Sequence, residues 1–198
     1  MTRDTNPFGA LSADIDDHEF ELFSANTLKA YAEQEKLTNF TVKHDQHLKT
    51  HDGTYQIDVL VEYTVLGARH TMLVECKKQS RRVERKVAAE LSRKIESTGA
   101  NKGLIISTAG FQSGAIQFAN AHGISLWQMV EKDVIRVVDS VHQMTPAEMQ
   151  FQLQVEKYLP KYIMMEWDCN AGCPLNRIYP TKEMYQAAIA KAKESYSD

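Results

Sequence analysis

A predicted β-hairpin is the feature that most constrains the fold of this 198-residue chain. Residues 57–65, IDVLVEYTV, alternate apolar and more polar side chains, which is typical of a strand with one apolar face and one mixed face. The residues LGAR follow, and Gly67 among them is a turn signal. Residues 71–77, TMLVECK, then read as a return strand. The pattern predicts two antiparallel strands that bury one side.

The return strand carries two charges, Glu75 and Lys77, at the end of an apolar run. A turn with an even number of residues at this glycine pairs positions whose numbers sum to 133 or to 135. Asp58 then lies opposite Glu75 in the first register and opposite Lys77 in the second. In both registers the two-residue period puts Asp58, Glu75 and Lys77 on one face and Cys76 on the other.

This group of charges suits a metal-dependent hydrolase. Two carboxylates a few ångström apart repel each other, and both stay ionised only with a cation between them. Asp58, Glu75 and the main-chain carbonyl of Cys76 form an all-oxygen ligand set, which suits Mg²⁺. Lys77 beside the metal can activate a water or stabilise charge on a phosphoryl oxygen. The alternative is a solvent-facing ion pair that contributes at most about 1 kcal/mol.

The rest of the chain alternates helices and strands. Asp16 or Asp17 can cap a helix over residues 18–35. Ser80 is a candidate N-cap for the next predicted helix, and Gly99 ends it. The further predicted elements are a helix over 81–99, a strand over 102–108, a helix over 110–123, and strands over 124–129 and 134–140. Such alternation predicts an α/β fold with partly parallel strand pairing.

The character of the sequence changes after residue 140. Residues 141–198 hold four of the five prolines and two helical patterns, at 146–159 and 181–195. We therefore predict a domain over residues 1–140 and a helical C-terminal extension over residues 141–198. Cys169 and Cys173 lie in this extension with C-x3-C spacing, but a zinc site needs two more ligands. The spacing favours a turn that carries two thiols.

Three stretches of the first domain resemble the Mrr-type restriction endonuclease family, which belongs to the PD-(D/E)xK nuclease superfamily. They are GTYQIDVLV, LVECKK and GLIISTAGFQSGAIQFANAHGISLW, and the resemblance covers residues 19–129. It implies a restriction-endonuclease-like core in the order αβββαβ, with a mixed central sheet flanked by helices. Two departures are a glutamate where the family often has glutamine, and DGTYQID in place of a GGID turn.

The resemblance also assigns roles to individual residues. It implies that Asp58, Glu75 and Lys77 are catalytic and that Asp58, Glu75 and the Cys76 carbonyl bind the metal. Glu21 resembles the glutamate of the first helix that often completes such sites, and Glu19 is its rival. The implied cofactor is Mg²⁺, for which Mn²⁺ can substitute.

The net charge of −3 means that any nucleic-acid footprint must be local. Polar and basic side chains cluster where the return strand meets the next helix, and these are candidates for binding DNA phosphates: Lys78, Gln79, Arg81, Arg82 and Arg85. The alternative is a solvated helix face. A third group, His44, His47 and His51, lies in HDQHLKTHDG, which reads as loop or edge and disfavours a histidine-metal nuclease.

The sequence thus predicts a metal-dependent phosphodiester hydrolase, and the family resemblance implies an endodeoxyribonuclease with a role in restriction or anti-phage defence. Cutting both strands with one site per chain predicts a homodimer or higher oligomer, and a defence-system protein is a further candidate partner. No secretion signal or membrane span is visible, so we expect a cytoplasmic protein without membrane contact. The alternative function is a catalytically silent nuclease-fold module that binds DNA or a protein within a larger complex.

Overall fold

The structure is a computed structural model, and it describes most of the chain between residues 15 and 195. The described residues are 15–35, 37–131, 151, 154–155, 157–170 and 172–195. The predicted strand over 134–140 and much of the predicted helix over 146–159 lie outside them. Among the helices that the structure describes, none has the length and the apolar character needed to cross a bilayer.

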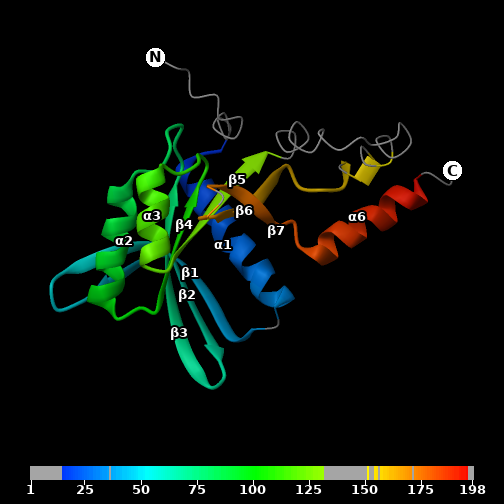
Figure 1. Cartoon of the computed structure of the whole chain (residues 1–198). Coiled ribbons are helices and arrows are strands. Elements are labelled where there is room, and N and C mark those ends of the chain that lie inside the picture. The colour runs from blue at the N-terminus through cyan, green and yellow to red at the C-terminus, as the bar shows by residue number, and fades with distance from the viewer. Residues whose placement is uncertain are drawn as a thin grey trace, which may run out of the picture.

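Seven strands and four helices have defined bounds in this part of the chain (Figure 1). The helices are α1 (Asp17–Gln34), α2 (Arg85–Thr98), α3 (Ser113–Ala121) and α6 (Lys182–Glu194). The strands are β1 (Thr38–Lys49), β2 (Thr54–Val65), β3 (Ala68–Lys77), β4 (Lys102–Ser107), β5 (Ile124–Glu131), β6 (Tyr162–Asp168) and β7 (Cys173–Tyr179). The order from α1 to β4 is the predicted αβββαβ, and the predicted fold class is confirmed.

All seven strands form one mixed sheet in the order of the sequence, β1 to β7. The pairs β3–β4 and β4–β5 are parallel, and the other four pairs are antiparallel. A parallel pair needs a crossover connection, and α2 and α3 supply the two crossovers. Because crossovers of this kind are right-handed and both steps run the same way along the sheet, the two helices cover the same face.

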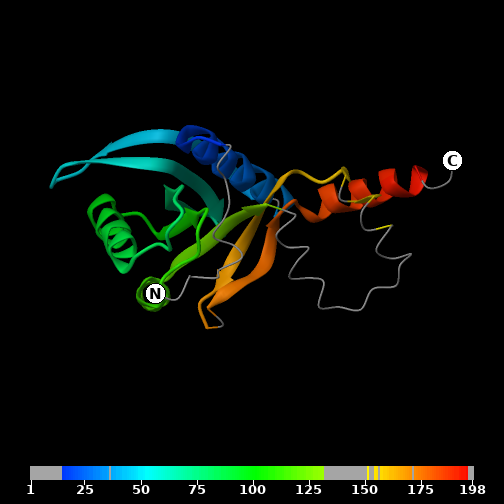
Figure 2. The ribbon, with the colours of Figure 1, turned by 90° about the horizontal axis from the view of Figure 1, so that it is seen from above.

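The sheet therefore separates two cores. Seen from above, α2 and α3 lie on one side of the sheet and α1 on the other (Figure 2). Leu73, Leu91 and Ile105 belong to the core beneath α2 and α3. Phe20 and Val74 belong to the core beneath α1. Since neighbouring residues of β3 supply opposite cores, this strand is buried on both sides at Leu73 and Val74.

The hairpin of β2 and β3 has the first of the two predicted registers. Val59 pairs with Val74, so paired residue numbers sum to 133 (59 + 74), and this is the last pair of the ladder before Asp58 and Glu75. Leu66 and Gly67 form the turn with φ angles of 52° and 78°. Two consecutive residues with positive φ give a tight turn whose twist matches that of the paired strands. The turn therefore fixes the register that brings the two carboxylates together.

The alternation predicted for β2 breaks at Asp58. Val59 packs in the core beneath α1, whereas Ile57, two residues earlier, packs beneath α2 and α3. On the neighbouring strand, Asp45 has a φ of 48°, and it lies between the pairs made by His44 and Gln46 with β2. The prediction of one continuous apolar face over residues 57–65 is thus wrong at its start, because the strand rotates at Asp58.

The ends of α1 and α2 test the capping predictions. Asp16 caps α1, and its side chain and that of Glu19 bond reciprocally to backbone N–H groups in a capping box. Gly99 ends α2 in the left-handed conformation, as predicted. The prediction of Ser80 as the N-cap of α2 is wrong, because the N-cap is Glu84, four residues further along the chain, and its side chain makes no capping hydrogen bond.

The predicted C-terminal helix is present as α6, and Thr181 caps it. Ahead of it, β6 and β7 extend the sheet, which corrects the expectation of a purely helical extension. Trp167 joins the core beneath α2 and α3, and Met164 joins the core beneath α1. These two strands are stabilised by burial against distant parts of the chain rather than by a local pattern. The division of the chain at residue 140 stays a prediction.

Candidate active site

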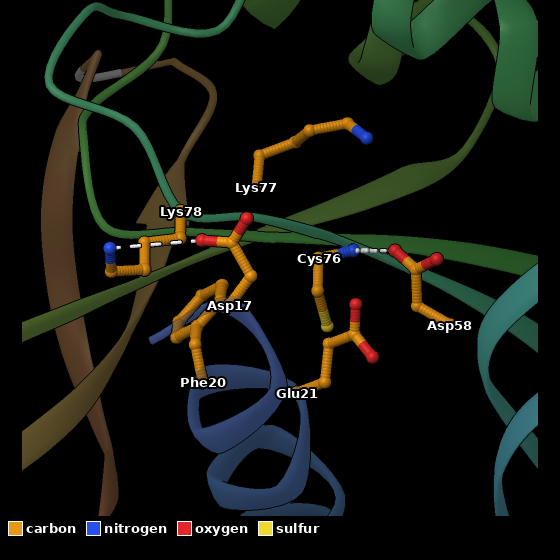
Figure 3. Close-up of a pocket in the computed structure, with 7 residues that line it drawn as sticks. All are labelled: Asp17, Phe20, Glu21, Asp58, Cys76, Lys77 and Lys78. Carbon is orange, nitrogen blue, oxygen red and sulfur yellow. Dashed lines mark hydrogen bonds and ion pairs between the residues drawn. The ribbon is translucent and has the colours of Figure 1, made fainter. Parts of the chain in front are cut away.

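Three elements meet where β3 ends. Asp58 comes from β2, and Cys76 and Lys77 come from the last residues of β3. Oδ2 of Asp58 accepts a hydrogen bond of 2.6 Å from the main-chain N–H of Cys76. Glu21 reaches the same place from the second turn of α1 (Figure 3). The hairpin places Asp58 at the end of β3, and the packing of α1 on the sheet places Glu21 there.

A pocket of about 220 Å³ occupies this point. It is lined by Asp17, Phe20, Glu21, Asp58, Cys76, Lys77 and Lys78. The carboxylates of Glu21 and Asp58 lie on the same side of the strand end, near Cys76 (Figure 3). Lys77 leaves β3 on the side opposite Cys76 and Glu21 (Figure 3). The pocket therefore combines carboxylate oxygens from two elements with an ammonium group.

Glu75 lies on the α2 side of β3 and is held by two lysines. Its Oε1 lies 2.6 Å from Nζ of Lys77, and its Oε2 lies 2.8 Å from Nζ of Lys94. Lys94 also donates a hydrogen bond of 3.1 Å to the carbonyl of Gln56. The Glu75 side chain is only 14% exposed. Glu75 does not line the pocket itself, and each of its carboxylate oxygens is engaged by a lysine.

The pKa of Asp58 is raised first by burial and then by nearby negative charge. Burial, and then the neighbouring charge of Glu75, raise the pKa of Asp58 from 3.8 to about 6. The Cys76 N–H and the ammonium group of Lys77 oppose this rise, and the charge of Glu21 adds to it. A bound cation would relieve this repulsion, because an opposite charge within a few ångström favours the ionised carboxylate.

Glu75 and Lys77 are both held in their charged forms. Burial acts to raise the pKa of Glu75, but hydrogen bonds and charge from Lys77 and Lys94 outweigh it and leave the pKa lowered. Burial acts to lower the pKa of Lys77, but its bond to Glu75 and the nearby charges leave the pKa raised. Lys77 is therefore an ammonium donor at neutral pH rather than a base.

The side chain of Cys76 is buried in the core and does not take part in the proposed chemistry. Its side chain is 8% exposed and packs in the core beneath α1, and burial raises the pKa of the thiol well above its ordinary value. The thiol is thus a neutral core group. Because alternate residues face opposite sides of a strand, the buried thiol of Cys76 lets Glu75 and Lys77 both face α2.

The predicted metal ligands fit a divalent cation by their chemistry. Carboxylates from Glu21, Asp58 and Glu75 and the carbonyl of Cys76 are oxygen donors, which Mg²⁺ prefers. Burial and the charge of Glu75 disfavour the ionised form of Asp58, and a bound cation would favour it. Glu19, the rival of Glu21, is engaged in the capping box at the start of α1 and does not line the pocket.

Buried hydroxyl groups fix the segment that follows β3. The Ser107 hydroxyl donates to the carbonyl of Lys77 at 3.1 Å. The Thr108 hydroxyl accepts from the N–H of Gln79 and donates to its carbonyl, both at 2.9 Å. Ser107 and Thr108 are almost completely buried. Since these bonds tie β3 to the end of β4, the backbone around Lys77 is held on both sides.

The five residues predicted to bind nucleic acid do not form one uniform surface. Lys78 lines the pocket with its Nζ 3.7 Å from Asp17, and the Gln79 amide donates to the Arg81 carbonyl at 2.6 Å. Arg81 is exposed and Arg82 is half-buried. The Arg85 guanidinium lies over the ring of Phe118, 5.3 Å from its centroid. Of these five residues, Lys78 lines the pocket, and the others do not.

Two contacts of the site were missed in the sequence. One is the contact of Lys94 with Glu75. Lys94 lies next to Leu91 and Ile95 of the apolar stripe of α2, and this position was a signal that its side chain could reach the sheet. The other involves His44, whose Nε2 lies 2.5 Å from Oε2 of Glu21. The expectation of a loop or edge around His44 is borne out in part, because β1 is the edge strand of the sheet. Its ordered ladder to β2 makes the position rigid.

Comparison with known families identifies the class of this chain. Residues 13–131 match the restriction endonuclease family of the Mrr catalytic type. The match spans more than half of the chain, and the chain belongs to this nuclease family. Nucleases with the PD-(D/E)xK motif usually use divalent metal ions. A search of curated proteins finds no match.

Solved structures show only distant likeness. A protein of unknown function, AF1548, is 14% identical with a TM-score of 0.44, and the alignment covers 89% of this chain and 98% of that one. Can2 from Sulfobacillus thermosulfidooxidans, in complex with cyclic tetra-adenylate, is 13% identical with a TM-score of 0.44 over 56% of this chain and 32% of its own. VC1899 from Vibrio cholerae is 15% identical with a TM-score of 0.43 over 55% and 29%. The family assignment rests on the family match alone.

Proposed function

We propose that this protein is a Mg²⁺-dependent endonuclease that hydrolyses DNA phosphodiester bonds. The observation that carries the proposal is the convergence of Asp58, Glu75 and Lys77 at the end of one hairpin, in a chain that belongs to a nuclease family. The raised pKa of Asp58 supports it, because a carboxylate whose ionisation is disfavoured gains from a bound cation.

Asp58, Glu75 and the carbonyl of Cys76 would hold the cation, with Glu21 as a further oxygen donor. When bound, the ion supplies positive charge against the phosphoryl oxygens and makes a nearby water more acidic. Glu75 would exchange one lysine contact for the cation, and Lys94 would keep its other oxygen in place. Mn²⁺ can substitute in an all-oxygen site of this kind.

Lys77 serves as a positive charge rather than as a proton acceptor in this proposal. Its pKa is raised, so its amine keeps the proton that a general base would need to lose. The ammonium group can donate hydrogen bonds to phosphoryl oxygens as negative charge develops on them. Lys77 lines the pocket together with Asp58, and the scissile phosphate would bind there.

The DNA would approach over the pocket and the residues that follow β3. Lys78 lines the pocket, and the exposed side chain of Arg81 lies three residues further on. Such cations position a phosphate backbone without reading its sequence. Specificity would then come from other surfaces: a second copy of this chain, residues 141–198 or a partner protein of a defence system. A homodimer would let two sites cut the two strands.

The test is nicking of supercoiled plasmid DNA with Mg²⁺ or Mn²⁺ and with EDTA as the blank. Wild type, Asp58→Ala and Lys77→Ala are compared, and Lys86→Ala, an exposed lysine of α2, is the matched control. We expect nicking by wild type and by the control only. Equal nicking by all four proteins would refute the proposal. DNA binding without nicking by wild type would instead support the silent DNA-binding module.

A further inference from the structure

We propose that the protein binds a second divalent cation, of the class of Zn²⁺, through His18, Glu21 and His44. One ligand atom from each of these residues lies within 4.8 Å of those from the other two. In the part of the chain that the structure describes, this is the group of histidine, cysteine and acidic side chains that meets this spacing. The site adjoins the active-site pocket but differs from it in donor chemistry.

The fold places the three ligands on rigid elements. His18 and Glu21 are three residues apart on α1, and this spacing puts two side chains on the same face of a helix. His44 pairs with Val59 within the ladder of β1 and β2. Since α1 packs against β1, the helix face and the strand are held against each other. No loop closure is needed to assemble the ligand set.

The three side chains lie close to one another. Nε2 of His44 lies 2.5 Å from Oε2 of Glu21. The rings of His18 and His44 meet edge to face, with centroids 5.0 Å apart and an interplanar angle of 69°. Ligands of one tetrahedral zinc ion lie about 3.4 Å apart, because each bond is about 2.0–2.1 Å long. Small rotations of the side chains would therefore open the group enough for an ion.

The donor set selects a different metal from the proposed Mg²⁺ site. Two imidazoles and one carboxylate suit Zn²⁺ and related transition metals, whereas Mg²⁺ prefers oxygen donors. Three protein ligands leave a fourth position open, as in catalytic zinc sites. The Glu21–His44 contact alone could be an ordinary hydrogen bond. The imidazole of His18, which has a ring nitrogen within 4.8 Å of both other ligand atoms, makes the group a ligand set.

Glu21 connects this site to the active-site pocket. One carboxylate oxygen faces His44, and Glu21 also lines the pocket beside Asp58. Glu21 would therefore be a ligand that the two proposed cation sites share. This last step rests on the proposed function, whereas the binding of a transition metal does not.

Titration of the full chain with Co²⁺, without an affinity tag and without DNA, tests the site. The visible absorption of bound Co²⁺ shows whether its ligands are tetrahedral. Competition with Zn²⁺ then measures the affinity of the same site for Zn²⁺. The variants are His18→Ala and His44→Ala, with His47→Ala as the matched control, since His47 is exposed on the same strand. Asp58→Ala keeps the histidine site while removing a proposed Mg²⁺ ligand.

We expect one tetrahedral Co²⁺ signal in wild type, His47→Ala and Asp58→Ala, because an all-oxygen site of the Mg²⁺ type does not give the tetrahedral spectrum. Changes to groups that only support a metal ligand weaken binding by about 10- to 100-fold. Loss of His18 or His44 should therefore weaken Co²⁺ binding by at least about tenfold. Equal affinity in all variants would overturn the proposal. His18 is exposed in the first turn of α1, so its variant tests the site even if His44→Ala does not fold.

The two proposals fail separately in these measurements. Loss of nicking in Asp58→Ala with Co²⁺ binding intact would support both. Equal nicking by wild type and Asp58→Ala would refute the proposed nuclease site and leave the histidine site standing. Unchanged Co²⁺ binding in His18→Ala and His44→Ala would refute the histidine site only.

Discussion

Replacing Asp58 with asparagine should stabilise the metal-free protein while it abolishes nicking. Asparagine keeps the shape of the side chain and an oxygen that can accept the Cys76 N–H bond. It removes a carboxylate whose ionisation is disfavoured by burial and by Glu75. The ionised carboxylate of Asp58, which the proposed chemistry needs, is thus a group that lowers the stability of the metal-free fold.

The sign and the size follow from the pKa of Asp58. The folded protein holds a proton on Asp58 up to about pH 6, whereas the unfolded chain releases it near pH 3.8. Stability therefore falls as the pH rises through this window, and the full penalty applies above it. The difference corresponds to about 3 kcal/mol. Screening of this partly exposed group by solvent reduces the effect to about 1–2 kcal/mol.

The assay is thermal unfolding in EDTA at pH 4 and at pH 7.5. We expect the Tm of Asp58→Asn to exceed that of wild type by about 2–8 °C at pH 7.5. The gap should shrink toward zero at pH 4, where both side chains are neutral. Mg²⁺ should raise the Tm of wild type and not that of the variant, because it binds the folded protein through Asp58.

Asp52 provides a control of opposite sign. Hydrogen bonds from Thr50, Ser97 and Tyr55 hold the pKa of Asp52 below its ordinary value. Its ionised form is favoured in the fold, so Asp52→Asn should lower stability at pH 7.5 and have little effect at strongly acidic pH. A less stable Asp58→Asn at pH 7.5, or a gap that does not change with pH, would refute the reasoning about Asp58.

Three further predictions concern the surroundings of the site. Lys94→Met removes the second ammonium partner of Glu75, the predicted catalytic glutamate. Because misplacing a catalytic group by 1 Å can cost about 10²-fold in rate, nicking should slow by at least about tenfold while DNA binding is retained. Unchanged nicking would exclude a positioning role for Lys94. Gly103→Ala should destabilise the fold by about 1 kcal/mol, because the added carbon would lie 2.6 Å from a side-chain carbon of α2. Gly114→Ala is its control and should be neutral or stabilising, since the nearest atom is 3.7 Å away. Arg81→Ala should weaken DNA binding and reduce the slope of affinity against salt by about one charge, whereas Lys191→Ala on α6 should change neither.

The sequence alone determined the hairpin and the charges at its end. Period and turn chemistry act over a few residues, so the pattern around Gly67 was enough to pair Asp58 with Glu75 or Lys77. The turn conformation then decided between the two registers, and Val59 pairs with Val74. Local rules also placed the start of α1 and the end of α2, because caps depend on neighbouring residues.

Only the tertiary structure decided which groups surround those charges. Glu21 and Glu19 are alike in the sequence, but the fold turns Glu21 into the pocket and leaves Glu19 in a capping box. Lys94 reaches Glu75 from nineteen residues away, and His44 reaches Glu21 from twenty-three. Such contacts depend on how helices pack on the sheet, and no local period encodes that packing. For the same reason the sequence did not predict β6 and β7, because distant parts of the chain form the cores that bury these strands.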